Sequence, residues 1–273
     1  MGFPPGDPWL RNAACIDLRD VTASAALRPA GAVRLSVDDL LHRPYLLPPR
    51  GQPLVLVGGQ RDAMQLVVQA LAAAGHADVR HLPEESWRDQ LPSESGPPSR
   101  TRLWEPSPAL VEALAAHPLP AGRTALDLAS GSGRNAVYLA LAGWEATAVD
   151  VLPDALERVG DLAGRSGVRV RTARIDLGFP GALDDLRADL VVVVRYLERT
   201  LFGPLQRVVL PGGLLVYETF TTDQAEVGHP RNPRFLLQPG ELRSAFPDLE
   251  LLSYREGFFE GAHLARLVAR APA

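Results

Sequence analysis

A glycine-rich turn between an apolar strand and a helix most constrains how this chain can fold. Segment 124–136 has the sequence TALDLASGSGRNA, which predicts a short strand over 125–128 and a helix from about Asn135. Gly131 permits a tight turn, and Gly133 has no side chain to keep the backbone away from a ligand. This strand, Gly-x-Gly turn and helix is where an open α/β sheet receives a nucleotide-like ligand.

The sequence after this turn alternates between apolar strands and helices. Such alternation predicts an α/β fold with a doubly wound, mainly parallel sheet. The expected strands, seven with the first, cover 145–149, 168–175, 189–194, 214–220, 249–255 and 261–269. No helix separates the last two, so we expect that pair to be antiparallel.

A smaller α/β pattern precedes this region. Short strands are expected over 14–18, 32–35, 53–57 and 79–82, and a helix over 61–74 that Gly75 ends. A polar stretch rich in proline, serine and glycine then predicts a linker. The expected organisation is a first domain over 1–90, a linker over 91–103 and a second domain over 104–273.

Composition excludes several classes of function. All 28 basic residues are arginine and the net charge is −4, so neither nucleic acid nor a membrane is an expected partner. The absence of lysine excludes a P-loop lysine and a Schiff base. One cysteine, Cys15, and an N-terminus without an apolar signal core favour a cytoplasmic protein. Six scattered histidines provide no metal-ligand spacing, so no metal site is expected.

Charged residues follow the expected strands of the second domain. Asp150 lies 19 residues after Gly131, the offset at which a carboxylate accepts hydrogen bonds from ribose hydroxyls. Asp176 ends the next strand and could accept from an adenine amine, and Arg195 ends the one after. Asp127 lies within the first strand and is expected near the turn.

These residues together resemble the class I S-adenosylmethionine-dependent methyltransferases, over the whole of 104–273. The carriers are the strand and turn 126–133, the pairs 149–150 and 175–176, the aliphatic run 189–194 and the Pro-Gly-Gly of 211–213. Within this family, 196–199 and 228–233 resemble the tellurite-resistance-like branch. The resemblance implies S-adenosylmethionine as cofactor. It implies a binding set of Asp127, Ala129, Ser130, Gly131, Ser132, Gly133, Asn135, Asp150, Val151, Asp176, Leu177 and Arg195.

Other interpretations of the same residues stay open. A nicotinamide-binding domain is the rival, but a pyrophosphate would not favour a carboxylate such as Asp127 beside it. Asp127 could instead be a solvated strand residue. Asp150 could serve only as a carboxylate that stabilises the N-terminus of the following helix, and Asp176 could serve only to form a turn. Arg195 departs from the branch, which more often has a small polar amide there.

The resemblance implies in-line methyl transfer to a small-molecule acceptor. Candidates for the acceptor side are Tyr196, Glu218, His229 and Arg231, and Arg231 with Arg195 would suit an anionic acceptor. No general base is assigned, because the sulfonium leaving group needs no protonation and a thiolate or chalcogen oxyanion is already nucleophilic. The alternative function is a non-catalytic S-adenosylmethionine-binding protein or scaffold.

The first domain resembles rhodanese-like domains through 16–19, the Gly31-Ala32 pair and the aliphatic strand 54–57. A sulfurtransferase of this family has a cysteine in the loop after that strand, where this chain has Gly58-Gly59-Gln60. Sulfur transfer through Cys15 is the unfavoured possibility, because Cys15 precedes the first strand's Asp17 and suits a buried apolar position. We therefore expect a non-catalytic module that docks a partner or packs.

Overall fold

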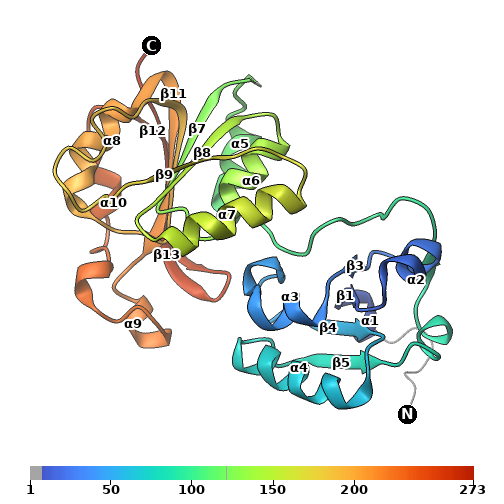
Figure 1. The fold of residues 1–273 in the computed structure, drawn as a ribbon. Helices are drawn as coiled ribbons and strands as arrows, with labels where there is room; N and C mark the ends of the chain where they lie inside the picture. The colour runs from blue at the N-terminus through green and yellow to red at the C-terminus, as the bar shows by residue number, and fades with distance from the viewer. Residues whose placement is uncertain (1–7, 121) are drawn as a thin grey trace. The chain divides into compact units, whose positions relative to one another are not determined.

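The computed structural model describes residues 8–120 and 122–273. The chain divides into two compact units, Met1–Glu105 and Pro106–Ala273, each treated separately below (Figure 1). The N-terminal segment expected to lack a signal core, residues 1–7, lies outside the described residues. Along the described parts, no helix combines the length and apolar character needed to cross a membrane.

The first unit contains a parallel four-stranded sheet with the order β3-β1-β4-β5. Its strands are β1 (Ala14–Asp17), β3 (Val33–Arg34), β4 (Leu54–Val57) and β5 (Val79–Leu82), near the ranges that the sequence predicts. All four residues of β1 and of β4 are buried, which explains the uninterrupted apolar run of β4. The longest helix of the unit is α4 (Arg61–Ala73), and α3 (Val37–His42) begins with a Ser36 capping box.

The expected linker contributes structure to the first unit. Within it, β6 (Ser93–Glu94) pairs antiparallel with β2 (Arg28–Pro29), and Leu91 packs against a core that includes the fully buried Trp87. The remaining short helices are α1 (Pro8–Asn12), α2 (Val21–Ala26), η1 (Pro44–Leu46) and η2 (Trp87–Asp89). The polar composition of this stretch predicted a linker and gave no indication of the β2–β6 pairing, which involves only two residues in each strand.

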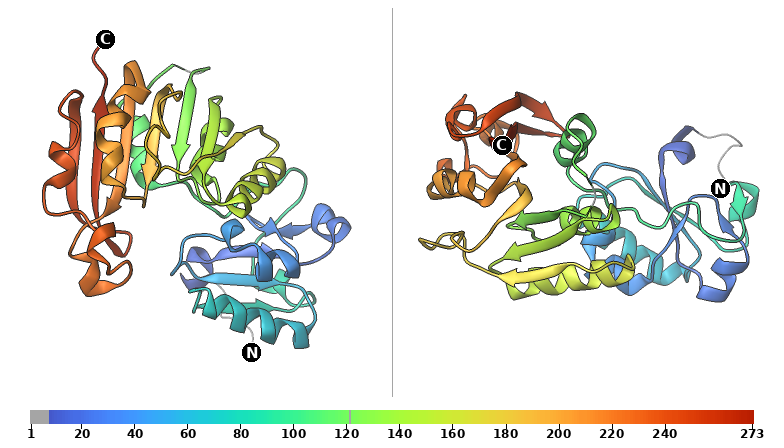
Figure 2. Two further views of the ribbon diagram at one scale, coloured as in Figure 1. Left: turned by 60° about the vertical axis from the view of Figure 1, so that its left-hand side comes forward. Right: turned by 90° about the horizontal axis from the view of Figure 1, so that it is seen from above.

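The second unit contains a seven-stranded sheet with the order β12-β13-β11-β10-β7-β8-β9. The strands are β7 (Thr124–Leu128), β8 (Glu145–Asp150), β9 (Arg171–Arg174), β10 (Ala188–Val194), β11 (Val209–Phe220), β12 (Glu250–Phe259) and β13 (Ala262–Arg270). Figure 2 shows them in a row, with the red β12 and β13 at one edge. β13 is antiparallel to both β11 and β12, so the mainly parallel sheet and its antiparallel last pair are confirmed. β9 is shorter than the predicted strand 168–175.

Helices cover both faces of this sheet (Figure 1). α5 (Pro108–Ala116), α6 (Arg134–Leu141) and α7 (Pro153–Arg165) lie on one face, and α8 (Phe202–Val208) and α10 (Glu241–Ser244) lie on the other. In β10, Leu190 and Val192 pack toward the first face, whereas Val191 and Val193 pack toward the second. A strand buried on both faces needs a continuous aliphatic run, which β10 has.

The strand order places a topological switch beside β7. The chain proceeds from β7 to β8 and β9, then returns to β10 on the opposite side of β7. Ligands of open α/β sheets bind outside the carboxyl ends of the strands at such a switch. Three short helical segments accompany the later strands: η3 (Arg199–Leu201), α9 (Gln224–Val227) and η4 (Pro233–Phe235).

Candidate cofactor site

The turn after β7 has three residues in left-handed conformation. Their φ angles are 55° at Ala129, 56° at Gly131 and 77° at Gly133. A Cβ on Gly133 would lie 2.6 Å from Cγ2 of Val159, so this glycine lets the turn pack closely on α7. A Cβ on Gly131 would meet no heavy atom within 4 Å, so the backbone of the turn faces open space there.

Asp150 ends β8 and holds the turn that follows β7. One carboxylate oxygen accepts a hydrogen bond from the Gly131 N–H at 2.8 Å, and the other accepts from the Leu152 N–H at 3.0 Å. An ionised carboxylate has about four acceptor sites, so Asp150 can still accept bonds from two hydroxyls. Asp150, which is expected to bind ribose, therefore also stabilises the glycine turn.

Asp127 lies behind the turn, not in solvent. It is 2 % exposed and accepts a hydrogen bond from the Ala136 N–H at 3.1 Å, in the first turn of α6. Burial raises the pKa of Asp127 to about 7, against the hydrogen bonds from Ala136 and Asn135, and nearby Asp150 raises it further. The alternative of a solvated strand residue is wrong, because the first turn of α6 covers this carboxyl group.

A polar network continues from Asn135 toward β13. The Asn135 side-chain oxygen accepts from the Ser107 N–H at 2.8 Å, and the Ser107 hydroxyl donates to Glu218 at 3.4 Å. Glu218 also accepts from Nε of Arg266 at 2.7 Å, and both side chains are almost fully buried. Burial raises the pKa of Glu218, and Arg266 opposes the shift. Glu218 is thus an internal ion-pair partner, which makes it a poor candidate for contact with the acceptor.

Residues at the tips of β8 and β9 differ in how they can face a ligand. Asp176 is exposed and accepts from the Gly178 N–H at 2.9 Å, so it forms the turn that the sequence left open as an alternative. Val151 is 41 % exposed next to Asp150. The Leu177 side chain is buried in the core, so only its backbone can contribute to a site.

Arg195 and Tyr196 follow β10. Arg195 has a φ of 56°, its N–H donates to the Glu218 carbonyl at 2.7 Å, and its guanidinium lies 5.4 Å from the Phe220 ring centroid. Burial raises the pKa of the Tyr196 hydroxyl, and Glu198, Asp176 and Asp150 raise it further. The tyrosine therefore shares an electrostatic environment with the two carboxylates proposed for the cofactor.

The loop that contains His229 and Arg231 is anchored by a residue that sequence reasoning missed. Both side chains are exposed. Gln224 is buried, donates to the His229 carbonyl at 2.9 Å, and accepts from the His263 N–H at 2.8 Å. Nothing in the sequence distinguishes Gln224, whereas Arg266, a charge within the apolar strand 262–270, was a signal available to sequence reasoning.

The residues present fit an adenosyl ligand with a cationic sulfonium. A carboxylate with spare acceptor sites lies at the tip of β8, and the glycine turn has open space above Gly131. Residues after the neighbouring strands add the charged groups of Asp176 and Arg195.

Comparisons with known proteins agree with this arrangement. The sequence profile of the family described as "Tellurite resistance protein TehB" matches residues 108–265, more than half of the chain. Ribosomal protein L11 methyltransferase of Pseudomonas paraeruginosa is 28 % identical over 92 % of this chain and 96 % of its own length. Hemagglutinin 1 of Eikenella corrodens is 31 % identical over 48 % of this chain and 45 % of its own length.

A solved structure supports the fold. The crystal structure of TehB from Haemophilus influenzae aligns with a TM-score of 0.51 and 22 % identity, over 61 % of this chain. The chain spans 62 % of the length of that protein. This chain therefore belongs to the TehB family and is an S-adenosylmethionine-dependent methyltransferase, with S-adenosylmethionine as its cofactor.

Proposed function

We propose that this enzyme transfers a methyl group in line from S-adenosylmethionine to a small anionic acceptor. When bound, the cofactor supplies an electrophilic methyl group on a sulfonium centre. The observation that carries the proposal is the hydrogen bond from the Gly131 N–H to Asp150. It joins the carboxylate that would bind the ribose hydroxyls to the backbone of the glycine turn. The family name supports an oxyanion acceptor, and the arginines Arg195 and Arg231 offer charge complementary to it.

We assign roles to the strand-tip residues within this proposal. Asp150 would accept the ribose hydroxyls, Asp176 would accept from the adenine amine, and the amides of 129–133 would face the rest of the cofactor. Tyr196 would border the acceptor, beside Arg195. The chain's main contribution is to align the acceptor with the methyl group, because the leaving group is already activated.

A protein acceptor is the second candidate. The Pseudomonas relatives named ribosomal protein L11 methyltransferase align with 92 % of this chain, so the likeness extends into the first unit. The first unit would then bind the protein substrate. A protein amine carries a proton at neutral pH and must lose it before attack, whereas a chalcogen oxyanion need not.

We also propose that residues 1–90 form a rhodanese-like domain without its catalytic cysteine, and that 104–273 form the methyltransferase domain. The parallel order β3-β1-β4-β5 and the Gly58-Gly59 turn after β4 support the first part. Residues 91–103 would then complete the first domain through β6 as well as link the two. A cytoplasmic location is consistent with the single buried cysteine.

Methyl transfer from radiolabelled S-adenosylmethionine tests these alternatives. The full chain is incubated with tellurite, selenite, small thiols, small phenols and, separately, ribosomal protein L11. We expect label on one of the small acceptors, with Asp150→Ala reducing the rate. Label on L11 alone would favour the protein acceptor. Cofactor binding without transfer to any of these acceptors would contradict the small-acceptor proposal.

A further inference from the structure

The first unit contains a cavity that the methyltransferase reaction does not use. Its volume is about 490 Å³, within the range of small-molecule sites. It lies beside the first halves of β1 and β4, where Cys15 and Val55 are paired neighbours and both line it. None of its described lining residues belongs to the Gly58-Gly59 turn, so it is separate from the position of a rhodanese-like active site.

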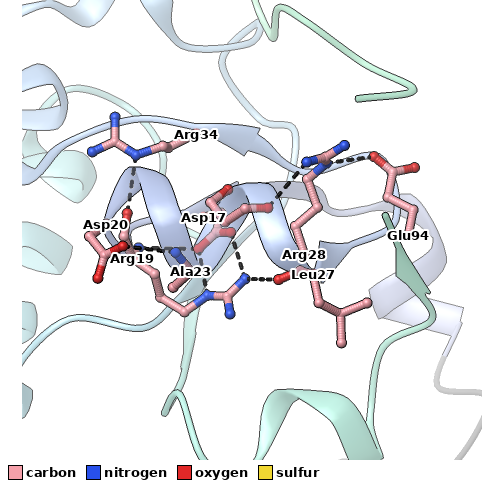
Figure 3. Close-up of polar contacts among 9 residues, drawn as sticks. Asp17, Arg19, Asp20, Ala23, Leu27, Arg28, Arg34 and Glu94 are labelled. Atoms are coloured by element: carbon pink, nitrogen blue, oxygen red, sulfur yellow. Dashed lines mark hydrogen bonds and ion pairs between the residues drawn. The ribbon is translucent and has the colours of Figure 1, made fainter. Parts of the chain in front are cut away.

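Residues 29–31 and 91–92 of the β2–β6 strap (residues 28–31 and 91–96) line one wall of this cavity. The Ala30 N–H donates to the Pro92 carbonyl at 2.8 Å, next to the β2–β6 pairing. Arg28 is buried and donates to Glu94 at 3.0 Å (Figure 3). It also donates to the Ser24 carbonyl at 3.1 Å and to the Gly96 carbonyl. Arg28 thus connects the two strands of the strap to each other and to the segment before it.

A second buried ion pair lies at the end of β1, the strand that contributes Cys15 to the lining. Asp17, which ends β1, accepts from Nε and Nη2 of Arg19 at 2.9 Å and 2.8 Å (Figure 3). The same guanidinium donates to the Leu27 carbonyl at 2.7 Å, just before the strap. These contacts join β1, which carries Cys15, to the segment that leads into the strap.

The lining has an apolar interior and a positively charged border. Cys15, Val55 and Leu91 provide apolar surface, whereas Arg11 and Arg100 provide guanidinium groups. Arg100 uses Nε for the Arg102 carbonyl at 2.9 Å, and its other N–H groups remain as possible donors. Among the described residues that line the cavity, two carry a positive charge and none carries a carboxylate. Arginine binds carboxylate, sulfonate and phosphate groups through paired N–H donors.

We propose that this cavity binds a small organic anion with an apolar body. The apolar part would lie against Cys15, Val55 and Leu91, and the acidic group would lie between Arg11 and Arg100. The site makes the first unit a ligand-binding module even though it has no sulfur-transfer cysteine after β4. It depends on neither the cofactor site nor the acceptor.

Paired fluorescent probes test the site in the full chain. 8-Anilinonaphthalene-1-sulfonate has an apolar body and one sulfonate, and N-phenyl-1-naphthylamine has the same body without the charge. We expect saturable binding of one sulfonate probe per chain, and about fivefold or greater weakening in both Arg11→Gln and Arg100→Gln. The neutral probe should bind these variants and the parent chain equally. Arg50→Gln, an exposed arginine outside the lining, is the matched control and should change neither affinity.

Two further measurements distinguish the site from other apolar surfaces. Ala13→Leu adds volume at the lining and should weaken both probes, while excess S-adenosylhomocysteine should displace neither. Thermal unfolding of each variant verifies that it is folded before binding is compared. Three results would overturn the proposal. The sulfonate probe could bind both arginine variants as tightly as the parent chain, or the two probes could lose affinity equally in these variants. S-adenosylhomocysteine could also displace a probe.

Discussion

The Asp150 carboxylate accepts a hydrogen bond from the Gly131 N–H at 2.8 Å, so the acid at the end of β8 holds the glycine turn at the end of β7. The two residues lie 19 positions apart in the sequence, but Asp150 ends β8 and Gly131 lies in the turn after its paired strand β7. Any ligand that contacts the turn amides therefore also lies beside this carboxylate. The relationship couples the shape of the turn to the charge that we expect to bind ribose.

Replacing Asp150 tests this coupling. Asp150→Ala leaves the Gly131 and Leu152 amides without their acceptor and removes the expected ribose contact. We expect S-adenosylhomocysteine affinity to fall about tenfold or more by calorimetry, since hydrogen bonds to charged groups contribute roughly 1.5 to 3 kcal/mol. Asp154→Ala, an exposed acid on α7 paired with Arg158, is the control and should keep the parent affinity. Similar affinities for both variants would contradict the assignment.

Gly133→Ala tests the close packing of the turn on α7. The added Cβ would lie 2.6 Å from Cγ2 of the buried Val159, at a φ of 77°. We expect a loss of about 2 to 4 kcal/mol in the free energy of unfolding, from strain and overpacking together. Gly143→Ala has a φ of 85° with no atom within 4 Å of the new Cβ, so it reports the backbone cost alone. Equal losses in urea denaturation would show that the contact with Val159 is unimportant.

Asp127 should make stability depend on pH in an unusual direction. Its pKa is raised from 3.8 to about 7 by burial, so between these values the folded chain keeps a proton that the unfolded chain releases. Its contribution is therefore fully present below pH 3.8 and is lost as pH rises through about 7. Urea denaturation at several pH values should show a steeper decline for the parent chain than for Asp127→Asn. Parallel curves would show that this group does not titrate as inferred.

Replacing only one partner of the Glu218–Arg266 ion pair should lower the free energy of unfolding strongly. Arg266→Gln leaves a buried carboxylate without its partner, and we expect a loss of about 3 to 5 kcal/mol in the free energy of unfolding. Replacing both residues by leucine should recover most of this loss, because no buried charge remains. The exposed Arg255, paired with Glu112, provides the control through Arg255→Gln. A double variant as unstable as the sum of its single variants would contradict the pairing.

Cys15 should be chemically inert in the folded chain. Burial raises the pKa of its thiol to about 12, with a smaller contribution from Asp17. At pH 8 only about one thiol in ten thousand would be ionised, and the thiolate is the reactive form. We expect slow reaction with Ellman's reagent in buffer, fast reaction in guanidinium, and no persulfide after thiosulfate treatment. Rapid persulfide formation in the folded chain would revive the sulfurtransferase hypothesis.

The sequence predicted the second unit's sheet well because two independent signals agreed there. The apolar run of β10 indicated a strand buried on both faces. The sequence predicts no helix between β12 and β13, which indicated that these two strands pair antiparallel. In the first unit, the β2–β6 pairing joins residues 64 and 66 positions apart through only two pairs. Local composition cannot indicate so short and distant a pairing, so this stretch was expected to be only a linker.

At the site, sequence spacing brought Asp150 to Gly131 but could not assign the direction of every side chain. Asp127 faces the first turn of α6, and Glu218 on β11 pairs with Arg266 on the neighbouring strand β13. Both outcomes depend on the register and on which face each residue occupies. The left-handed conformation of Ala129, where glycine would be unstrained, also has no local signal.

A crystal structure of the full chain with S-adenosylhomocysteine tests the central claim most directly. We predict that the ribose hydroxyls donate to Asp150, that the adenine lies beside Asp176, and that the ligand contacts the turn around Gly131. A ligand bound elsewhere, or ribose hydroxyls that contact neither oxygen of Asp150, would contradict the account.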